Sequence, residues 1–136
     1  MGYLIKKSVS DLVRAKITLT NAELLSGVIK SIPEYPAIKG KYWAVNYMIG
    51  FLNNQTIPFV GGASIHIQAD TANNYQSKFV NLWIAATSDQ QAFSGTSTGW
   101  DVNFVTNAEL QIHKPLPSTN GDGSMDIYIG AYLIEI

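Results

Sequence analysis

The stretch Ser124-Met125-Asp126-Ile127-Tyr128-Ile129-Gly130-Ala131-Tyr132-Leu133-Ile134-Glu135-Ile136 follows a Gly121-Asp122-Gly123 turn and decides the fold class. Its apolar and aromatic residues predict one long strand, and the glycines before it are typical of a tight turn. A strand this apolar would fray in water, so a second sheet or another chain must cover it. The sequence therefore predicts a layered all-β protein.

Other segments have the same strand character. Between residues 11 and 20, apolar and polar residues alternate with a period of two, which indicates a half-buried strand. Tyr42–Leu52 is rich in aromatic and β-branched residues, and we expect a central strand buried on both faces. A buried helix is the weaker alternative there because of Gly50 and the lack of caps. Further strands are expected at residues 65–69, 80–86 and 108–113.

The segments between these strands contain little helix. Asn21–Leu25 predicts a single helical turn that is capped by Asn21 and ends at Gly27. Residues 87–106 are rich in Ser, Thr, Gln and Gly, so we expect long loops with short strand pieces at most. We predict one domain over residues 1–136, a two-sheet antiparallel sandwich of about seven or eight strands with jelly-roll topology. Residues 1–9 are expected to form an extended N-terminal arm.

The composition favours an assembling protein over one that binds nucleic acid or membrane. Charged residues make up 14% of the chain, against about 25% in typical soluble domains, and neutral polar residues replace them. Interface cores are depleted in the same charges, so we expect a homo-oligomer. A net charge of −1 does not favour binding to the phosphates of nucleic acid, and no apolar run is long enough for a membrane helix. Without cysteines or a secretory signal, synthesis in a cytoplasm is expected.

No motif in the chain predicts catalysis or a cofactor. His66 and His113 lie on alternating strands and could meet across a sheet near Asp70 or Asp122, but their spacing matches no metal motif, and structural roles are favoured. Asn120–Gly123 resembles part of a calcium loop, yet Glu135 is too distant to act as its last ligand, and a tight turn explains the same residues. We therefore expect a non-enzymatic protein without metal or cofactor.

The aromatic residues supply the candidate contact site. Trp43 and Trp83 lie in apolar strands and are expected in the core. Trp100 lies in a polar loop, where an indole either contacts a partner or a glycan or folds back over the sheet edge. Together with Tyr75 and Phe93, Trp100 is our candidate contact site for a partner or glycan.

Three segments resemble small structural proteins encoded in tailed-bacteriophage genomes. These are Lys16–Thr20 with the Leu-containing turn Asn21–Leu25, the Pro36–Lys41 approach to an apolar strand, and the Gly121–Ile129 turn and strand. The resemblance implies a non-enzymatic β-sandwich on the head or tail of the virion, assembling as a symmetric oligomer. No residue role is implied by it.

The expected function is that of a virion structural subunit, as a head decoration, a fibre or a tail accessory protein. Its expected partners are further copies of itself, most simply in a trimer, and other virion proteins. The alternative is a glycan- or receptor-binding module on a host surface, and the two functions can coexist in one receptor-binding virion protein.

Overall fold

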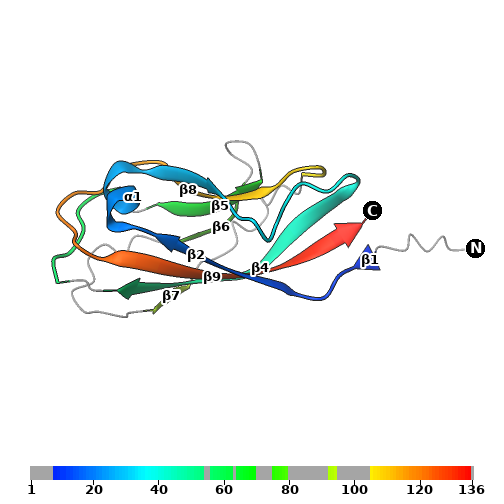
Figure 1. Cartoon of the computed structure of the whole chain (residues 1–136), viewed down its shortest axis with the longest axis horizontal. Coiled ribbons are helices and arrows are strands. Elements are labelled where there is room, and N and C mark those ends of the chain that lie inside the picture. Colours follow the sequence, from blue (N-terminus) through cyan, green and yellow to red (C-terminus); the bar gives the residue numbers. More distant parts are fainter. Residues whose placement is uncertain are drawn as a thin grey trace, which may run out of the picture.

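The structure is a computed structural model that describes residues 8–53, 56–62, 64–69, 75–79, 92–94 and 105–135. Two antiparallel sheets face each other (Figure 1). The first sheet contains β1 (Ser8–Val9), β2 (Val13–Leu19), β4 (Lys41–Asn53), β7 (Ala92–Ser94) and β9 (Ser124–Glu135). The second sheet contains β3 (Val28–Ser31), β5 (Ile65–Ala69), β6 (Tyr75–Phe79) and β8 (Leu110–Lys114). The predicted all-β two-sheet sandwich is confirmed.

The order of the strands is that of a jelly roll. The first sheet has the order β2-β9-β4-β7, with the short β1 also paired to β9, and the second has the order β3-β8-β5-β6. After β2, each strand except β6 lies in the opposite sheet from the strand before it. As a result β9 lies between β2 and β4, and β8 lies between β3 and β5. Apart from the short β1, these eight described strands form the double-sheet jelly roll that the sequence predicted.

The core lies between the sheets and is built by the period-two pattern of the strands. Met125, Ile127 and Ile129 on β9 have no exposed surface, whereas the alternate residues Asp126 and Tyr128 face outward. Trp43 is also buried, as predicted, and its indole Nε1 donates to the carbonyl of Pro36 at 2.8 Å. The long apolar strand is therefore covered by the second sheet.

The prediction that Tyr42–Leu52 is buried on both faces was wrong for the second half of β4. Met48 and Leu52 are buried on the inner face, but Tyr47, Ile49 and Phe51 are only partly buried. The physical reason is alternation, because these three side chains lie on the outer face of the first sheet. The apolar residues of this strand therefore form a core on one face and an apolar outer surface on the other.

A bulge in β4 is completed from the opposite layer. The pairing of β4 with β9 shifts between Val45 and Tyr47, which interrupts the ladder there. The buried side chain of Gln76, on β6, accepts from the Val45 amide at 2.9 Å and donates to the Trp43 carbonyl at 2.8 Å. One amide thus satisfies backbone groups beside the bulge and ties the two sheets together.

The short helix α1 (Asn21–Ser26) is present, but its cap differs from the prediction. Thr20 is the N-cap, and its hydroxyl accepts from the amide of Glu23 while the Glu23 carboxylate accepts from the Thr20 amide. This reciprocal capping box displaces Asn21 into the first turn. The Asn21 side chain donates instead to the carbonyls of Gly121 and Gly123, which fixes α1 against the turn before β9.

A hydrogen-bond network around a buried lysine joins two loops at the α1 end of the sandwich. Lys114, at the end of β8, is 1% exposed, and its ammonium donates to the Leu116 carbonyl at 2.6 Å and to the Ser118 hydroxyl at 2.8 Å. Ser118 in turn donates to the Gly61 carbonyl at 2.8 Å. Residues 56–62 and 114–119 are therefore held to each other by hydrogen bonds.

Several predictions fall outside the described residues. These include the strand at 80–86 with Trp83, most of the loop at 87–106, and most of the N-terminal arm, of which only β1 is described. Strand β6 was not predicted, while the short β7 agrees with the expected strand pieces in the loop. Within the described ranges, none of the helical structure has the length and apolar character needed to cross a bilayer.

Candidate functional site

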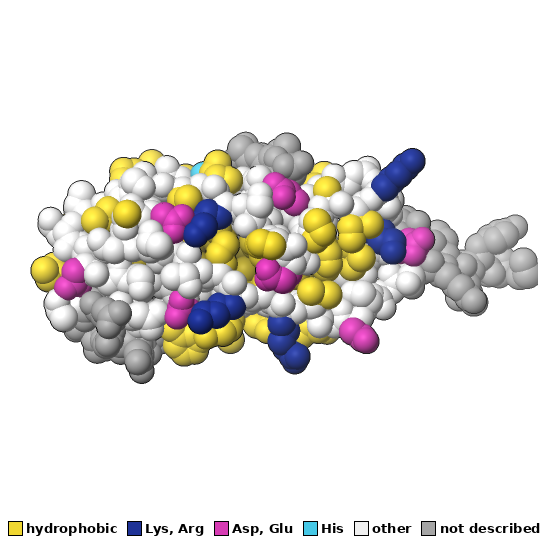
Figure 2. Space-filling view, viewed as in Figure 1, with side chains coloured by type: hydrophobic (Ala, Val, Ile, Leu, Met, Phe, Trp, Pro, Cys, Tyr) yellow, Lys and Arg dark blue, Asp and Glu magenta, His cyan; other side chains and the backbone are white. Residues whose placement is uncertain are grey.

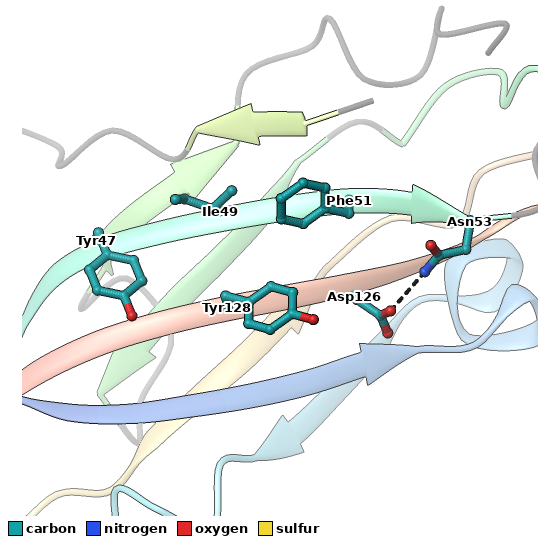
Figure 3. Close-up of a pocket in the computed structure, with 6 residues that line it drawn as sticks. All are labelled: Tyr47, Ile49, Phe51, Asn53, Asp126 and Tyr128. Carbon is teal, nitrogen blue, oxygen red and sulfur yellow. Dashed lines mark hydrogen bonds between the residues drawn. The ribbon is translucent and has the colours of Figure 1, made fainter. Parts of the chain in front are cut away.

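An aromatic groove lies on the outer face of the first sheet, where β4 and β9 pair along their length (Figure 3). Its volume is about 540 Å³, and its described lining comprises Tyr47, Ile49, Phe51, Asn53, Asp126 and Tyr128. All six residues occupy outward positions of two adjacent strands, which explains why a regular sheet places them together. We call this surface the β4–β9 groove.

The aromatic rings of the groove are held at an angle to one another. Phe51 and Tyr128 meet edge to face, with their ring centroids 5.7 Å apart and an angle of 88° between the rings. The Tyr47 ring lies over Gly130, where a Cβ atom would come within 2.2 Å of the Tyr47 Cε1 atom. The absence of a side chain at position 130 therefore gives Tyr47 its place.

One carboxylate is fixed at the edge of these rings. Asp126 accepts from the Thr18 hydroxyl at 2.6 Å and from the Asn53 amide nitrogen at 2.8 Å, and the Lys16 ammonium lies 3.9 Å from it. Lys16 also lies 5.6 Å from the centroid of the Tyr128 ring. Three strands, β2, β4 and β9, therefore orient one acidic group beside an apolar surface.

The arrangement is suited to binding. Aromatic faces can stack on the apolar face of a sugar or on an apolar side chain, while Asp126 and Asn53 can hydrogen-bond to hydroxyl or amide groups. Small-molecule sites typically combine an apolar lining with a few fixed polar groups. The β4–β9 groove has this character among the described residues.

The aromatic residues predicted as a contact site are not those that line the groove. Trp100 lies outside the described residues. Tyr75 begins β6 in the second sheet, and Phe93 lies in β7, paired in register with Gly50. The missed signal was the alternation of Tyr47, Ile49 and Phe51, which becomes a site only when β9 pairs with it.

The turn that resembled a calcium loop is bound to the protein itself. The Asp122 carboxylate accepts from the backbone amides of Thr56 and Ile57 at 2.8 and 2.9 Å, and also from the Thr56 hydroxyl. These hydrogen bonds lower the pKa of Asp122 to about 2. The carboxylate therefore clamps a neighbouring loop, which agrees with the turn interpretation.

The two histidines do come together, as register partners on β5 and β8. Asp70 lies outside the described residues, and Asp122 belongs to the clamp. Over the part of the chain that the structure describes, no group of three or more His, Cys, Asp or Glu residues is arranged to hold a metal ion.

Comparison of the chain with protein-family models, with curated proteins and with solved structures finds no match.

Proposed function

We propose that this protein is a non-enzymatic structural subunit of a tailed-bacteriophage virion, a head or tail accessory protein that assembles as a symmetric homo-oligomer. The resemblance of three segments to such proteins motivates the proposal, and the jelly roll is an architecture that viral capsid domains use. That second support is an analogy at the level of the fold. The contact surface must be argued from the residues themselves.

The observation that carries the proposal is a set of exposed aliphatic side chains on firmly held loops. Ile57, Val60 and Leu116 are 50%, 54% and 62% exposed, and we call them the apolar end residues. Their two segments are joined by the hydrogen bond from the Ser118 hydroxyl to the Gly61 carbonyl and by the paired backbone groups of Val60 and Thr119, both at 2.8 Å. Exposed apolar groups on a preorganised backbone mark an interaction surface, because little conformational entropy is lost on binding.

A second copy of the chain is the occupant that we propose for this surface. The molecule carries a net charge of −1, so identical copies repel each other weakly. Uncharged polar and apolar side chains also cover most of the face in Figure 2, with only scattered charges. A surface of this composition suits a contact between like subunits.

Sedimentation velocity at tens of micromolar protein tests the assembly. The parent protein should sediment as a discrete oligomer, most simply a trimer, and Leu116→Asp should raise the dissociation constant at least tenfold by placing a charge in the contact. Ile29→Asp is the matched control, because Ile29 is 56% exposed but lies on β3. A monomeric parent, or equal effects of the two variants, contradicts the proposed contact.

The virion assignment has its own test. Mass spectrometry of purified particles from the phage that carries the gene should find the protein in a fixed ratio to the capsid or tail proteins. Absence from particles would defeat the virion assignment, even if the protein forms an oligomer.

Glycan binding is the second candidate function, and the β4–β9 groove is the observation that favours it. A sugar ring stacked on Tyr128 would lie within reach of Asp126 and Asn53 as hydrogen-bonding partners. On a glycan array followed by calorimetry with the best ligand, Tyr128→Ala should weaken binding at least tenfold. Tyr132→Ala is the control, since Tyr132 lies on the same strand outside the groove. An array without hits removes this candidate.

A further inference from the structure

The two histidines occupy directly opposed positions in the second sheet. His66 on β5 pairs in register with His113 on β8, and their ring centroids are 6.2 Å apart with an angle of 48° between the rings. Opposed residues on antiparallel strands project from the same face, so both imidazoles belong to one local surface. They are also the only histidines of a chain that has no cysteine.

A one-directional chain of hydrogen bonds leads away from His113. Its Nδ1 atom lies 3.0 Å from Oε1 of Gln68, whose Nε2 atom donates to Gln111 at 3.1 Å. Gln111 donates in turn to the Glu109 carboxylate at 3.0 Å. Because the Gln68 oxygen can only accept, the Nδ1 atom of His113 must donate.

These hydrogen bonds determine the tautomer of the His113 ring. A neutral imidazole that donates through Nδ1 carries its lone pair on Nε2. His113 thus presents a defined metal-ligating nitrogen, beside a second imidazole that is 8% exposed.

We infer that His66 and His113 form a two-imidazole binding site for a late first-row divalent metal ion such as Zn²⁺, with Gln68 as the residue that positions His113. Metal-ligating histidines almost always donate their other ring nitrogen to a fixed acceptor, which raises their basicity and sets the ring orientation. The Gln68–Gln111–Glu109 chain supplies such an acceptor and ends on a carboxylate. Imidazole nitrogen suits Zn²⁺, Ni²⁺ and Cu²⁺, and water completes the coordination.

The separation of the rings is compatible with a shared ion. With Zn–N bonds of about 2.0–2.1 Å and a tetrahedral angle, two coordinated imidazoles have centroids about 5 Å apart. The observed 6.2 Å must therefore shorten by about 1 Å, a change within reach of side-chain rotation.

Nuclear magnetic resonance of the ring nitrogens tests the site in the intact protein. Long-range proton–nitrogen spectra at pH 7 should show His113 as the Nδ1–H tautomer, and a Zn²⁺ titration should shift the nitrogens of both rings to saturation at one ion per chain. Calorimetry with Zn²⁺ should then show at least tenfold weaker binding for His66→Gln and for His113→Gln. Gln68→Leu keeps both histidine ligands but removes the acceptor that fixes the Nδ1–H tautomer of His113. This variant should weaken Zn²⁺ binding roughly 10- to 100-fold.

The control on the same face is Ser31→Ala. Ser31 donates to Glu109 at the far end of the chain, at 2.9 Å, so its loss should leave Zn²⁺ affinity unchanged. An Nε2–H tautomer at His113, or no saturable binding at millimolar Zn²⁺, overturns the inference. Equal Zn²⁺ affinity in the parent and in both histidine variants also overturns the inference. Circular dichroism checks that each variant is folded, and if one is not, the Zn²⁺ titration of both rings in the parent protein decides the matter.

Discussion

Single residues in this protein carry structural tasks that their sequence motifs leave open. The Asp122 turn can be read as part of a calcium loop or as a tight turn, and its contacts favour the second reading. Its oxygens accept two backbone amides and one hydroxyl from the loop at residues 56–57. That contact joins positions 66 residues apart, which no local pattern in the sequence reveals.

The Asp122 clamp predicts an acid-dependent contribution to stability. Its folded pKa is lowered from 3.8 to about 2, so the unfolded state takes up a proton first as the pH falls. The stabilisation is therefore complete above about pH 4 and is lost progressively toward pH 2. Thermal unfolding of the parent and of Asp122→Ala should show a gap in melting temperature at pH 7 that narrows between pH 4 and pH 2. A constant gap across that range contradicts the clamp.

Gly130 predicts a steric coupling within the groove. In Gly130→Ala the new Cβ atom would overlap the Tyr47 ring, which must swing away and abandon its position over β9. Because Tyr47 is only partly buried, we expect a modest loss of about 1 kcal/mol in the free energy of unfolding. Urea denaturation measures it. In a Tyr47→Ala background, Gly130→Ala should lower the free energy of unfolding much less. An equal loss in both backgrounds would rule out the overlap with the Tyr47 ring.

At the scale of elements, the strands could be predicted but their neighbours could not. Alternation located β2, β5 and β8, and the density of apolar and aromatic residues located β4 and β9, because these signals are local. The groove depends on the register that places Ile49 beside Tyr128 and Phe51 beside Asp126. These partners are more than 70 residues apart in sequence, so the candidate site emerges only from pairing. The N-cap was predicted one residue too late because Thr20 and Asn21 are both favourable N-cap residues, so the sequence alone does not distinguish them.

The burial of Lys114 predicts a rise in stability at alkaline pH. Burial lowers the pKa of Lys114 from 10.5 to about 8, so the folded state loses its proton first as the pH rises. The unfolded state then binds more protons, and the free energy of unfolding rises with pH between about 8 and 10, by at most about 1.4 kcal/mol per pH unit. Comparison with Lys114→Met, which lacks the titrating group, isolates this effect in urea denaturation at pH 7.5 and 9.5. If the difference in the free energy of unfolding between the parent and Lys114→Met does not grow from pH 7.5 to 9.5, the predicted titration of Lys114 is contradicted.

At the scale of the whole molecule, the expected number of strands and the near absence of helix were sufficient to predict the sandwich and its jelly-roll topology. Covering the apolar strand β9 required a second sheet, and few helical segments were available to serve instead. The contact surface was harder to locate. Low charge density favours assembly but does not locate the contact surface. The apolar end residues become a candidate surface only because hydrogen bonds join their two loops.

The proposed assembly predicts that thermal stability depends on protein concentration. When folded chains associate and unfolded chains do not, mass action stabilises the folded state, so the melting temperature rises as concentration increases. The parent protein should show this rise over a hundredfold concentration range in scanning calorimetry. Leu116→Asp should remove most of it while leaving the melting temperature at the lowest concentration nearly unchanged, because Leu116 is 62% exposed and contributes little to the core. Ile29→Asp should retain the concentration dependence. A variant of Leu116 that melts lower at every concentration by the same amount would instead identify a role within the monomer, and the apolar end residues would then not be the surface through which copies meet.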